Sequence, residues 1–201
     1  MEQEQALAAE SEAAPREEEV IAEGTAEAVT GVIVLEEGPA LTNETLRDWL
    51  KRWCAGDREG LPHISTWITN KVTDFSNLFE DQSEFNDDIG TWDTSSVTTM
   101  EGMFRNAKSF NQPLNDWRVD NVPNMSHMFF GASAFNQPLN DWRVDNVTDM
   151  WAMFARASAF NHPLGDWKLR PDCRTSYMFD GTNFRNSRPV GGNPGGCCAI
   201  S

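Results

Sequence analysis

The sequence predicts an α/β repeat solenoid of about five coils, each made of one short strand and one short helix, with a helix capping the N-terminal end. Tryptophan recurs at intervals of 25 residues, and phenylalanine keeps the same interval in two further columns. The segment 110–122 also recurs letter for letter at 135–147. A fixed period of this size is typical of solenoids, in which each repeat packs only on its neighbours. The tryptophans of the repeat are Trp67, Trp92, Trp117, Trp142 and Trp167.

Residues 1–40 are acidic, and their composition predicts a disordered segment. They hold eleven glutamates and a single basic residue, Arg16, with little aromatic content. A segment of this composition cannot bury enough apolar surface to offset the conformational entropy that it would lose on folding.

A capping helix is predicted within residues 41–59. It begins at Thr42 or Asn43, which are residue types that favour the N-cap position, and it ends at Gly56. Its apolar side chains have the i, i+3, i+4, i+7 spacing of one helical face. These side chains are Leu46, Trp49, Leu50 and Trp53.

The solenoid itself is predicted over residues 60–185. Around each tryptophan, polar and apolar residues alternate, as in the segment 116–120, and this pattern is typical of a short strand. After the strand the period changes to that of a helix of about two turns. In one repeat the residues on this helical face are Met100, Met103, Phe104 and Ala107. So short a helix is marginal alone in water, so we expect stacking on the next coil to hold it.

The last repeat departs from the pattern, and residues 186–201 predict a flexible tail rich in Gly and Pro. Asp172 replaces a valine, Thr175 replaces a methionine, and Phe184 arrives one residue early. This degeneration is typical of a terminal repeat that caps a solenoid.

The repeat resembles that of the BspA-like leucine-rich-repeat surface proteins, in particular the 25-residue repeat of mycoplasma lipoproteins. The resemblance covers about residues 41–185. It implies a leucine-rich-repeat-like fold, display at a cell surface and protein binding. The residues that carry it in one repeat are Phe110, Asn111, Pro113, Leu114, Trp117, Val122, Met125, Met128 and Phe129.

Composition and the placement of reactive residues argue against several classes of function. The net charge of −15 and the lack of a basic cluster argue against nucleic acid as a partner. His63, His127 and His162 occupy unrelated positions of the repeat, so no catalytic arrangement is predicted. We therefore expect no enzyme, no cofactor and no metal site. The start of the chain has no signal-peptide pattern, and the longest apolar run, 32–35, is far too short to span a membrane.

The last four residues, Cys-Ala-Ile-Ser, match a prenylation box. A prenyltransferase requires a thiol at the fourth position from the end, here Cys198, and a terminal serine favours a farnesyl group. One farnesyl anchors weakly, so a second signal is needed, and Cys197 is the candidate for palmitoylation. The sequence thus predicts a tether to the cytoplasmic face of a membrane.

The outward face of the predicted strands carries aligned columns of charge, which we call the charged strip. It is a candidate face for a protein partner of unknown identity, although a solvated surface with diagonal ion pairs explains it as well. The inward Trp and Met columns are predicted to form the core, and the Asn column beside each Phe to form a ladder of side-chain amides. The charged strip consists of Asp116, Arg118, Asp120, Asp141, Arg143, Asp145 and Lys168.

Three functional hypotheses remain from the sequence. The first is a non-enzymatic interaction module that a farnesyl group on Cys198 holds at a membrane. The second is a BspA-like adhesion-type protein at the cell surface or secreted, and the third is a soluble scaffold without lipid.

Overall fold

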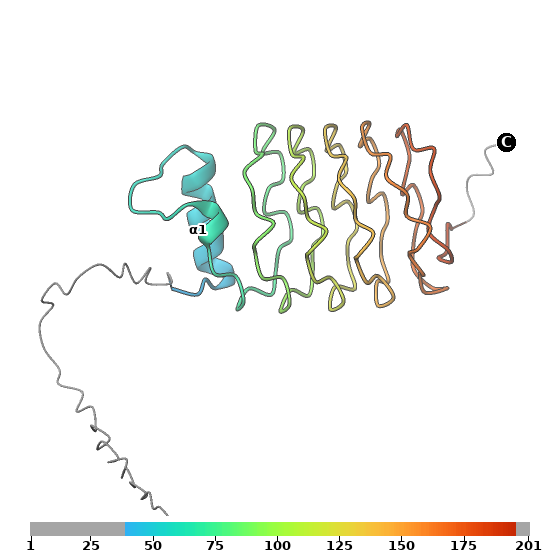
Figure 1. Cartoon of the computed structure of the whole chain (residues 1–201), viewed down its shortest axis with the longest axis horizontal. Helices are drawn as coiled ribbons and strands as arrows, with labels where there is room; N and C mark the ends of the chain where they lie inside the picture. Colours follow the sequence, from blue (N-terminus) through green and yellow to red (C-terminus); the bar gives the residue numbers. More distant parts are fainter. Residues whose placement is uncertain (1–38, 196–201) are drawn as a thin grey trace, which may run out of the picture. The chain divides into compact units, whose positions relative to one another are not determined.

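The computed structural model describes residues 39–195 of the chain, so the predictions for residues 1–38 and for Cys197 and Cys198 lie outside the described part. A helix, α1 (Asn43–Cys54), is followed by a short 3-10 helix, η1 (Ile64–Thr66), and then by coils that lie side by side (Figure 1). Single parallel bridges link equivalent residues of successive repeats. They run along the column Asp74, Thr99, Asn124, Asp149 and Arg174.

The predicted capping helix is confirmed. Thr42 is the N-cap of α1, and its side chain and that of Thr45 bond each other's backbone N–H groups in a capping box. One face of α1 is buried through Leu46, Leu50 and Trp53. Because this face packs against the first coil, α1 covers apolar side chains that would otherwise meet water.

The predicted short helix of each repeat is wrong. Residues 100–107 form a run of turns in which the backbone N–H groups alternate between two directions. The N–H groups of Met100 and Phe104 donate to carbonyls of the next coil, at 3.1 and 2.8 Å. Those of Met103 and Ala107 donate to the residue three positions earlier in their own coil, at 3.3 and 3.0 Å. Every second backbone N–H of this segment therefore bonds a carbonyl of the next coil. The i to i−4 hydrogen bonds of an α-helix do not form in it.

The predicted strand around each tryptophan is also wrong, although its alternation of burial is confirmed. Trp117 and Val119 are buried and Arg118 is exposed, yet the segment contains turns and no strand. The tryptophan side chain takes the place of a backbone ladder here. The indole N–H of Trp142 donates to the Leu114 carbonyl of the preceding coil at 2.8 Å, and Trp92, Trp117 and Trp167 use the same register. Trp67, in the first coil, donates instead to the nearby Pro62 carbonyl at 3.0 Å.

Ladders of identical side chains hold the coils together. The rings of Phe104, Phe129 and Phe154 stack at centroid distances of 5.4 and 5.5 Å, with their planes within 8° of parallel. The predicted asparagine ladder is confirmed, because the side-chain oxygen of Asn111 accepts the backbone N–H of Asn136 at 2.9 Å. The chain is thus a regular repeating domain built on stacked Trp and Phe columns with a 25-residue spacing.

The two ends of the stack are closed differently. At the N-terminal end, the Asn43 side chain of α1 accepts the N–H groups of Thr73 and Asp74, at 2.9 and 3.2 Å. At the C-terminal end, Val190 and Asn193 form bridges with Lys168 and with the end of the bridge column. The prediction of a flexible tail from residue 186 is therefore wrong for the segment 187–194, because its backbone pairs with the last coil.

Candidate interaction surface

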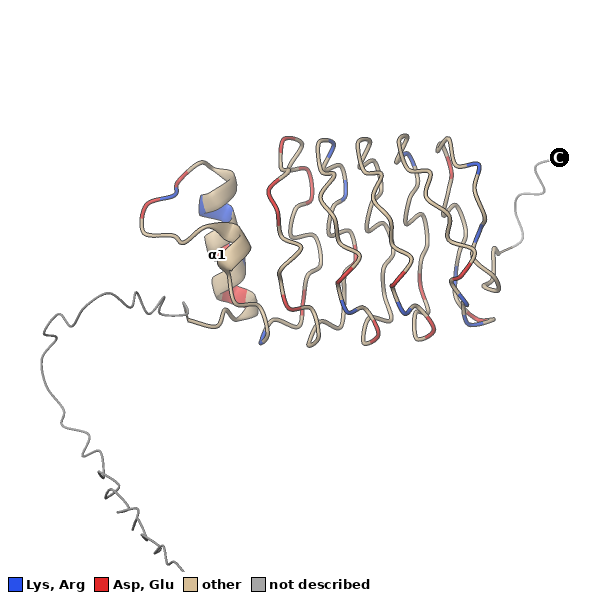
Figure 2. Cartoon of the chain, in the orientation of Figure 1, with Lys and Arg blue, Asp and Glu red and all other residues tan. Residues whose placement is uncertain are grey.

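The structure brings part of the charged strip together. Five of its members lie around a shallow hollow beside Trp117, whereas Asp145 and Lys168 do not line it. Figure 2 shows that acidic and basic residues are mixed over the later coils, whereas the segment between Lys71 and Arg105 in the first coils carries acidic residues alone. The members at the hollow are Asp116, Arg118, Asp120, Asp141 and Arg143.

The charged strip is a solvated surface with weak internal contacts. Arg118 pairs with Asp120 of its own coil at 3.4 Å, and not with a diagonal neighbour. Exposed pairs of this kind contribute little, because water screens the charges and the side chains lose conformational freedom.

A second surface, which the sequence analysis missed, lies on the turn runs between the bridge column and the next phenylalanine. Aromatic rings and arginines from four successive repeats contact one another there. We call it the aromatic–arginine patch. It consists of Arg105, His127, Phe130, Trp151, Arg156, Arg174 and Tyr177.

One half of the patch is organised around Trp151. The His127 ring lies 4.3 Å from the Trp151 ring, nearly perpendicular to it, and the Tyr177 ring lies 6.3 Å away in the same kind of edge contact. The guanidinium of Arg174 sits 4.8 Å from the centre of a Trp151 ring. Tyr177 is 52% exposed, which is unusual for so large an apolar side chain in this molecule.

The other half is organised around Phe130. The guanidinium groups of Arg105 and Arg156 lie 5.9 and 5.4 Å from the centre of its ring. His127 contacts the same ring edge-on at 5.8 Å and so joins the two halves. Cation–π contacts of this kind orient an arginine while leaving its N–H donors free for a ligand.

The backbone under the patch is unusual. Each turn run has two residues in the left-handed region, and these residues form two columns across the coils. His127 and Tyr177 lie in the first column, with φ of 55° and 58°, and Arg156 lies in the second, with φ of 60°. Left-handed backbone is unfavourable for residues with a Cβ atom. Patch residues therefore occupy positions where glycine or asparagine would be more stable.

The charges of the patch are only partly neutralised. Arg105 pairs with Glu80 at 3.1 Å and Arg174 pairs with Asp149 at 3.4 Å. Within residues 39–195, Arg156 has no acidic partner. Burial, helped by the positive charge of Arg105, lowers the pKa of His127, so its ring is neutral at neutral pH.

A signal for the patch was present in the sequence. The Phe, Trp and Met columns hardly change between repeats, but the positions of the patch change in every repeat. The first left-handed column reads Asn77, Gly102, His127, Ala152 and Tyr177. A search for columns that vary, rather than for columns that repeat, would have found it.

The remaining reactive residues lie apart from one another. Burial raises the pKa of the Cys173 thiol to about 11, so this thiol stays protonated. Across residues 39–195, no three His, Cys, Asp or Glu side chains are grouped closely enough to hold a metal ion. Over the same range, no helix has the length and apolar character required to cross a membrane.

Comparison with protein-family models decides where the chain belongs. The model of DUF285, described as a mycoplasma protein of unknown function, matches residues 55–167 and 92–190. The chain is a member of the DUF285 family. The two DUF285 matches overlap, as expected for a repeat, and together they cover residues 55–190, which hold the coils and the first part of the segment that closes them. The match confirms the mycoplasma type of repeat but does not carry the leucine-rich-repeat name. No curated protein and no solved structure matches the chain.

Proposed function

We propose that this DUF285 protein is a non-enzymatic interaction module that binds a partner protein through the aromatic–arginine patch. The observation that carries the proposal is the mutual contact of four aromatic rings and three arginines at the surface of a stack whose buried Trp and Phe columns are uniform. Trp, Tyr and Arg are the residues most enriched among those that dominate binding energy at protein interfaces.

The scaffold under the patch supports this role. The backbone of the turn runs is held by hydrogen bonds to the next coil, such as those from His127 to Trp151 and from Gly131 to Ala155, at 2.9 and 2.8 Å. A surface fixed in this way loses little conformational freedom when a partner binds. Because the rings already contact one another, they are also held in one arrangement before binding.

The chemistry of the patch indicates the chemistry of the partner. Flat ring surfaces bury apolar side chains, and the Arg156 guanidinium, which has no acidic partner within residues 39–195, binds a carboxylate. We therefore infer a partner segment that presents aromatic or aliphatic side chains next to an Asp or Glu. The neutral ring of His127 can accept or donate one hydrogen bond at the centre of this surface.

A site-specific photo-crosslinking experiment tests the proposal. A photoreactive amino acid is placed at Tyr177 in one variant and at Arg118, in the charged strip, in another, and both are expressed in cells of the source organism. We expect a discrete crosslinked protein from position 177 that disappears when Trp151→Ala is added. The same protein captured from position 118, or capture from 177 that is unaffected by Trp151→Ala, would contradict the proposal.

A membrane tether at Cys198 is a separate part of the proposed function. It is supported by the Cys-Ala-Ile-Ser motif and applies where Ser201 is the last residue of the protein in the cell. Metabolic labelling with a farnesyl analogue, compared between the wild type and Cys198→Ser, tests it, and equal labelling of the two would end the idea. The alternative location, at the cell surface, predicts that protease added to intact cells degrades the repeat.

A further inference from the structure

The hydrogen bonds between turn runs all point in one direction along the stack. Alternate N–H groups of each run donate to carbonyls of the following coil, as those of Asn77, Phe79 and Asp81 do at 2.8 Å. Within residues 100–107 and the equivalent residues of the neighbouring coils, no backbone N–H donates to the preceding coil. A turn run therefore presents donors on its C-terminal side and acceptors on its N-terminal side.

The last coil leaves its row of donors open. The N–H groups that would bond a following coil belong to Tyr177, Phe179 and Gly181, and no acceptor among residues 39–195 bonds them. The carbonyls between them, those of Met178 and Asp180, already accept N–H groups of the preceding coil. This part of the C-terminal face thus presents donors without acceptors.

A row of donors alone does not suit the usual occupants of an open edge. A β-strand carries N–H and C=O groups together on each edge, so its own N–H groups would face the donors. Two C-terminal faces of this chain would likewise bring donors against donors. The N-terminal face of a second copy is covered by α1, whose Arg47 guanidinium donates to the Ser76 carbonyl at 3.0 Å. The ligand must therefore supply acceptors that carry no donors of their own.

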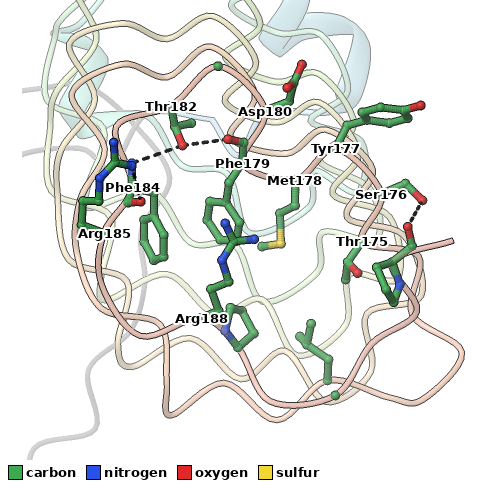
Figure 3. Close-up of a pocket in the computed structure, with 15 residues that line it drawn as sticks. Thr175, Ser176, Tyr177, Met178, Phe179, Asp180, Thr182, Phe184, Arg185 and Arg188 are labelled. Atoms are coloured by element: carbon green, nitrogen blue, oxygen red, sulfur yellow. Dashed lines mark hydrogen bonds between the residues drawn. The ribbon is translucent and has the colours of Figure 1, made fainter. Parts of the chain in front are cut away.

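Positive side chains lie at the same edge. A hollow of about 700 Å³ beside the row is lined by Arg185 and Arg188 of the chain that follows the last coil (Figure 3). Neither arginine forms an ion pair within residues 39–195. Asp180 is the acidic residue of the lining, and in Figure 3 its carboxylate points away from Arg188. Guanidinium groups and backbone N–H groups of turns both bind anions, and an ionised carboxylate accepts hydrogen bonds without donating any.

The Phe179 ring adds an apolar part to this edge. It stacks on Phe154 of the preceding coil at 5.8 Å, and no ring among residues 39–195 lies beyond it. The Arg188 guanidinium lies there instead, 5.0 Å from the centre of the Phe179 ring. A cation–π contact at an exposed site is weak. An apolar side chain of a ligand can therefore take this place on the ring while Arg188 turns to an adjacent carboxylate.

We propose that this edge, which we call the C-terminal donor site, binds an acidic segment of a partner protein. Side-chain carboxylates of that segment accept the open backbone N–H groups and pair with the arginines, and an apolar side chain beside them covers the Phe179 ring. The site consists of the N–H groups of Tyr177, Phe179 and Gly181 and the side chains of Arg185 and Arg188. It shares only Tyr177 with the aromatic–arginine patch, to which that residue contributes its ring and not its N–H.

An NMR titration of the full-length protein with a synthetic peptide tests the proposal. The peptide consists of glutamates around a single leucine, and its ends are acetylated and amidated so that all of its carboxylates are side chains. We expect saturable shifts of the Phe179 and Gly181 amides and none of the Phe154 amide, which already donates to the Met178 carbonyl at 2.9 Å. The same peptide with glutamine in place of glutamate should bind about ten-fold more weakly or worse, because the charged acceptors are lost. Absence of binding, equal affinity for the glutamine peptide, or shifts that leave out Phe179 and Gly181 would overturn the proposal.

Two matched arginine substitutions separate the site from the net charge of the chain. Arg188→Gln should weaken binding of the glutamate peptide about ten-fold, because a charge-assisted hydrogen bond is lost. Arg118→Gln removes the same charge from the charged strip and should leave the affinity unchanged. The Thr175 amide, which donates to the Asn193 carbonyl at 3.0 Å, reports whether the closing segment is intact in both variants. Equal weakening by the two substitutions would contradict the proposal.

Two further titrations identify the other occupants that the site could have. Inorganic phosphate that displaces the peptide and produces the same shifts of Phe179 and Gly181 would assign the edge to a small anion and overturn the proposal. Trp151→Ala dismantles the aromatic–arginine patch and should leave the affinity for the peptide unchanged. Loss of peptide binding in that variant would place the peptide on the patch and not on the C-terminal donor site. The proposal can therefore fail without affecting the function proposed for the patch, and the reverse also holds.

Discussion

Phe129 and Phe130 are neighbours in the chain, yet they belong to two different regions of the molecule. Phe129 is fully buried in a column of stacked rings, with Phe104 at 5.4 Å on one side and Phe154 at 5.5 Å on the other. Phe130 is partly exposed in the aromatic–arginine patch, between two arginines. The column keeps one residue type in all repeats, and the position of Phe130 does not. In this protein, repetition marks the positions that stacking requires, and variation marks the positions that stacking leaves free.

The physical reason lies in the neighbours of each position. A buried ring contacts its equivalents above and below, so a change in one repeat leaves a gap against two others. A turn-run side chain at the surface meets mainly water, and the backbone below it is fixed by bonds between coils. The column that contains Phe130 therefore accepts Glu80, Arg105, Ala155 and Asp180 in the other repeats.

Replacing these two phenylalanines in turn is the strongest test of the contrast. Phe129→Ala should lower the free energy of unfolding by about 3–5 kcal/mol, because it removes buried apolar area and leaves a cavity in the stack. Phe130→Ala should lower it by about 1 kcal/mol or less, since it loses only surface contacts. Chemical denaturation of both variants measures the difference. Similar losses for the two would mean that the patch is part of the core.

The asparagine ladder tests the repeated region at a polar position. The Asn111 side-chain oxygen accepts the Asn136 N–H at 2.9 Å and the Gln137 side chain at 3.2 Å. Asn111→Ala should therefore lower the free energy of unfolding by about 1 kcal/mol, whereas Asn111→Asp keeps the acceptor and should lose less. Denaturation at neutral pH compares them. An equal loss in both would show that the amide group, and not its oxygen, is what the ladder needs.

Much of the stack could be predicted from the sequence, because each of its signals arises from packing between coils. The Trp and Phe columns, the capping helix and the asparagine ladder all follow from residues whose identity is dictated by their neighbours. The N-cap of α1 is a local signal, which narrowed the predicted helix start to Thr42 or Asn43, and the structure has Thr42 in that position.

The conformation of the turn runs could not be predicted in the same way. Met100, Met103, Phe104 and Ala107 are all buried, so the pattern of burial was correct. A helix and a run of turns bonded to the next coil bury the same spacing of residues, however, and only the hydrogen bonds between coils distinguish them. Segment 187–194 was missed for a related reason, because its glycines indicate flexibility in isolation. Gly191 in fact allows close packing, since a Cβ atom there would lie 2.5 Å from the Leu169 carbonyl oxygen.

The patch was missed because its residues differ from repeat to repeat and so do not contribute to the periodic pattern. A substitution at Arg156 tests whether the patch residues serve binding and not the stability of the stack. Arg156 is exposed and left-handed, so Arg156→Gly should raise the free energy of unfolding by about 0.5–1 kcal/mol by relieving backbone strain. The same change removes the cation beside Phe130 and should weaken crosslinking to the partner. Arg156→Asn tolerates the left-handed backbone and should show the binding loss with a smaller gain in stability. If Arg156→Gly is less stable than the wild type, the Arg156 side chain stabilises the stack. The claim that the varied positions contribute little to stability would then be wrong at Arg156.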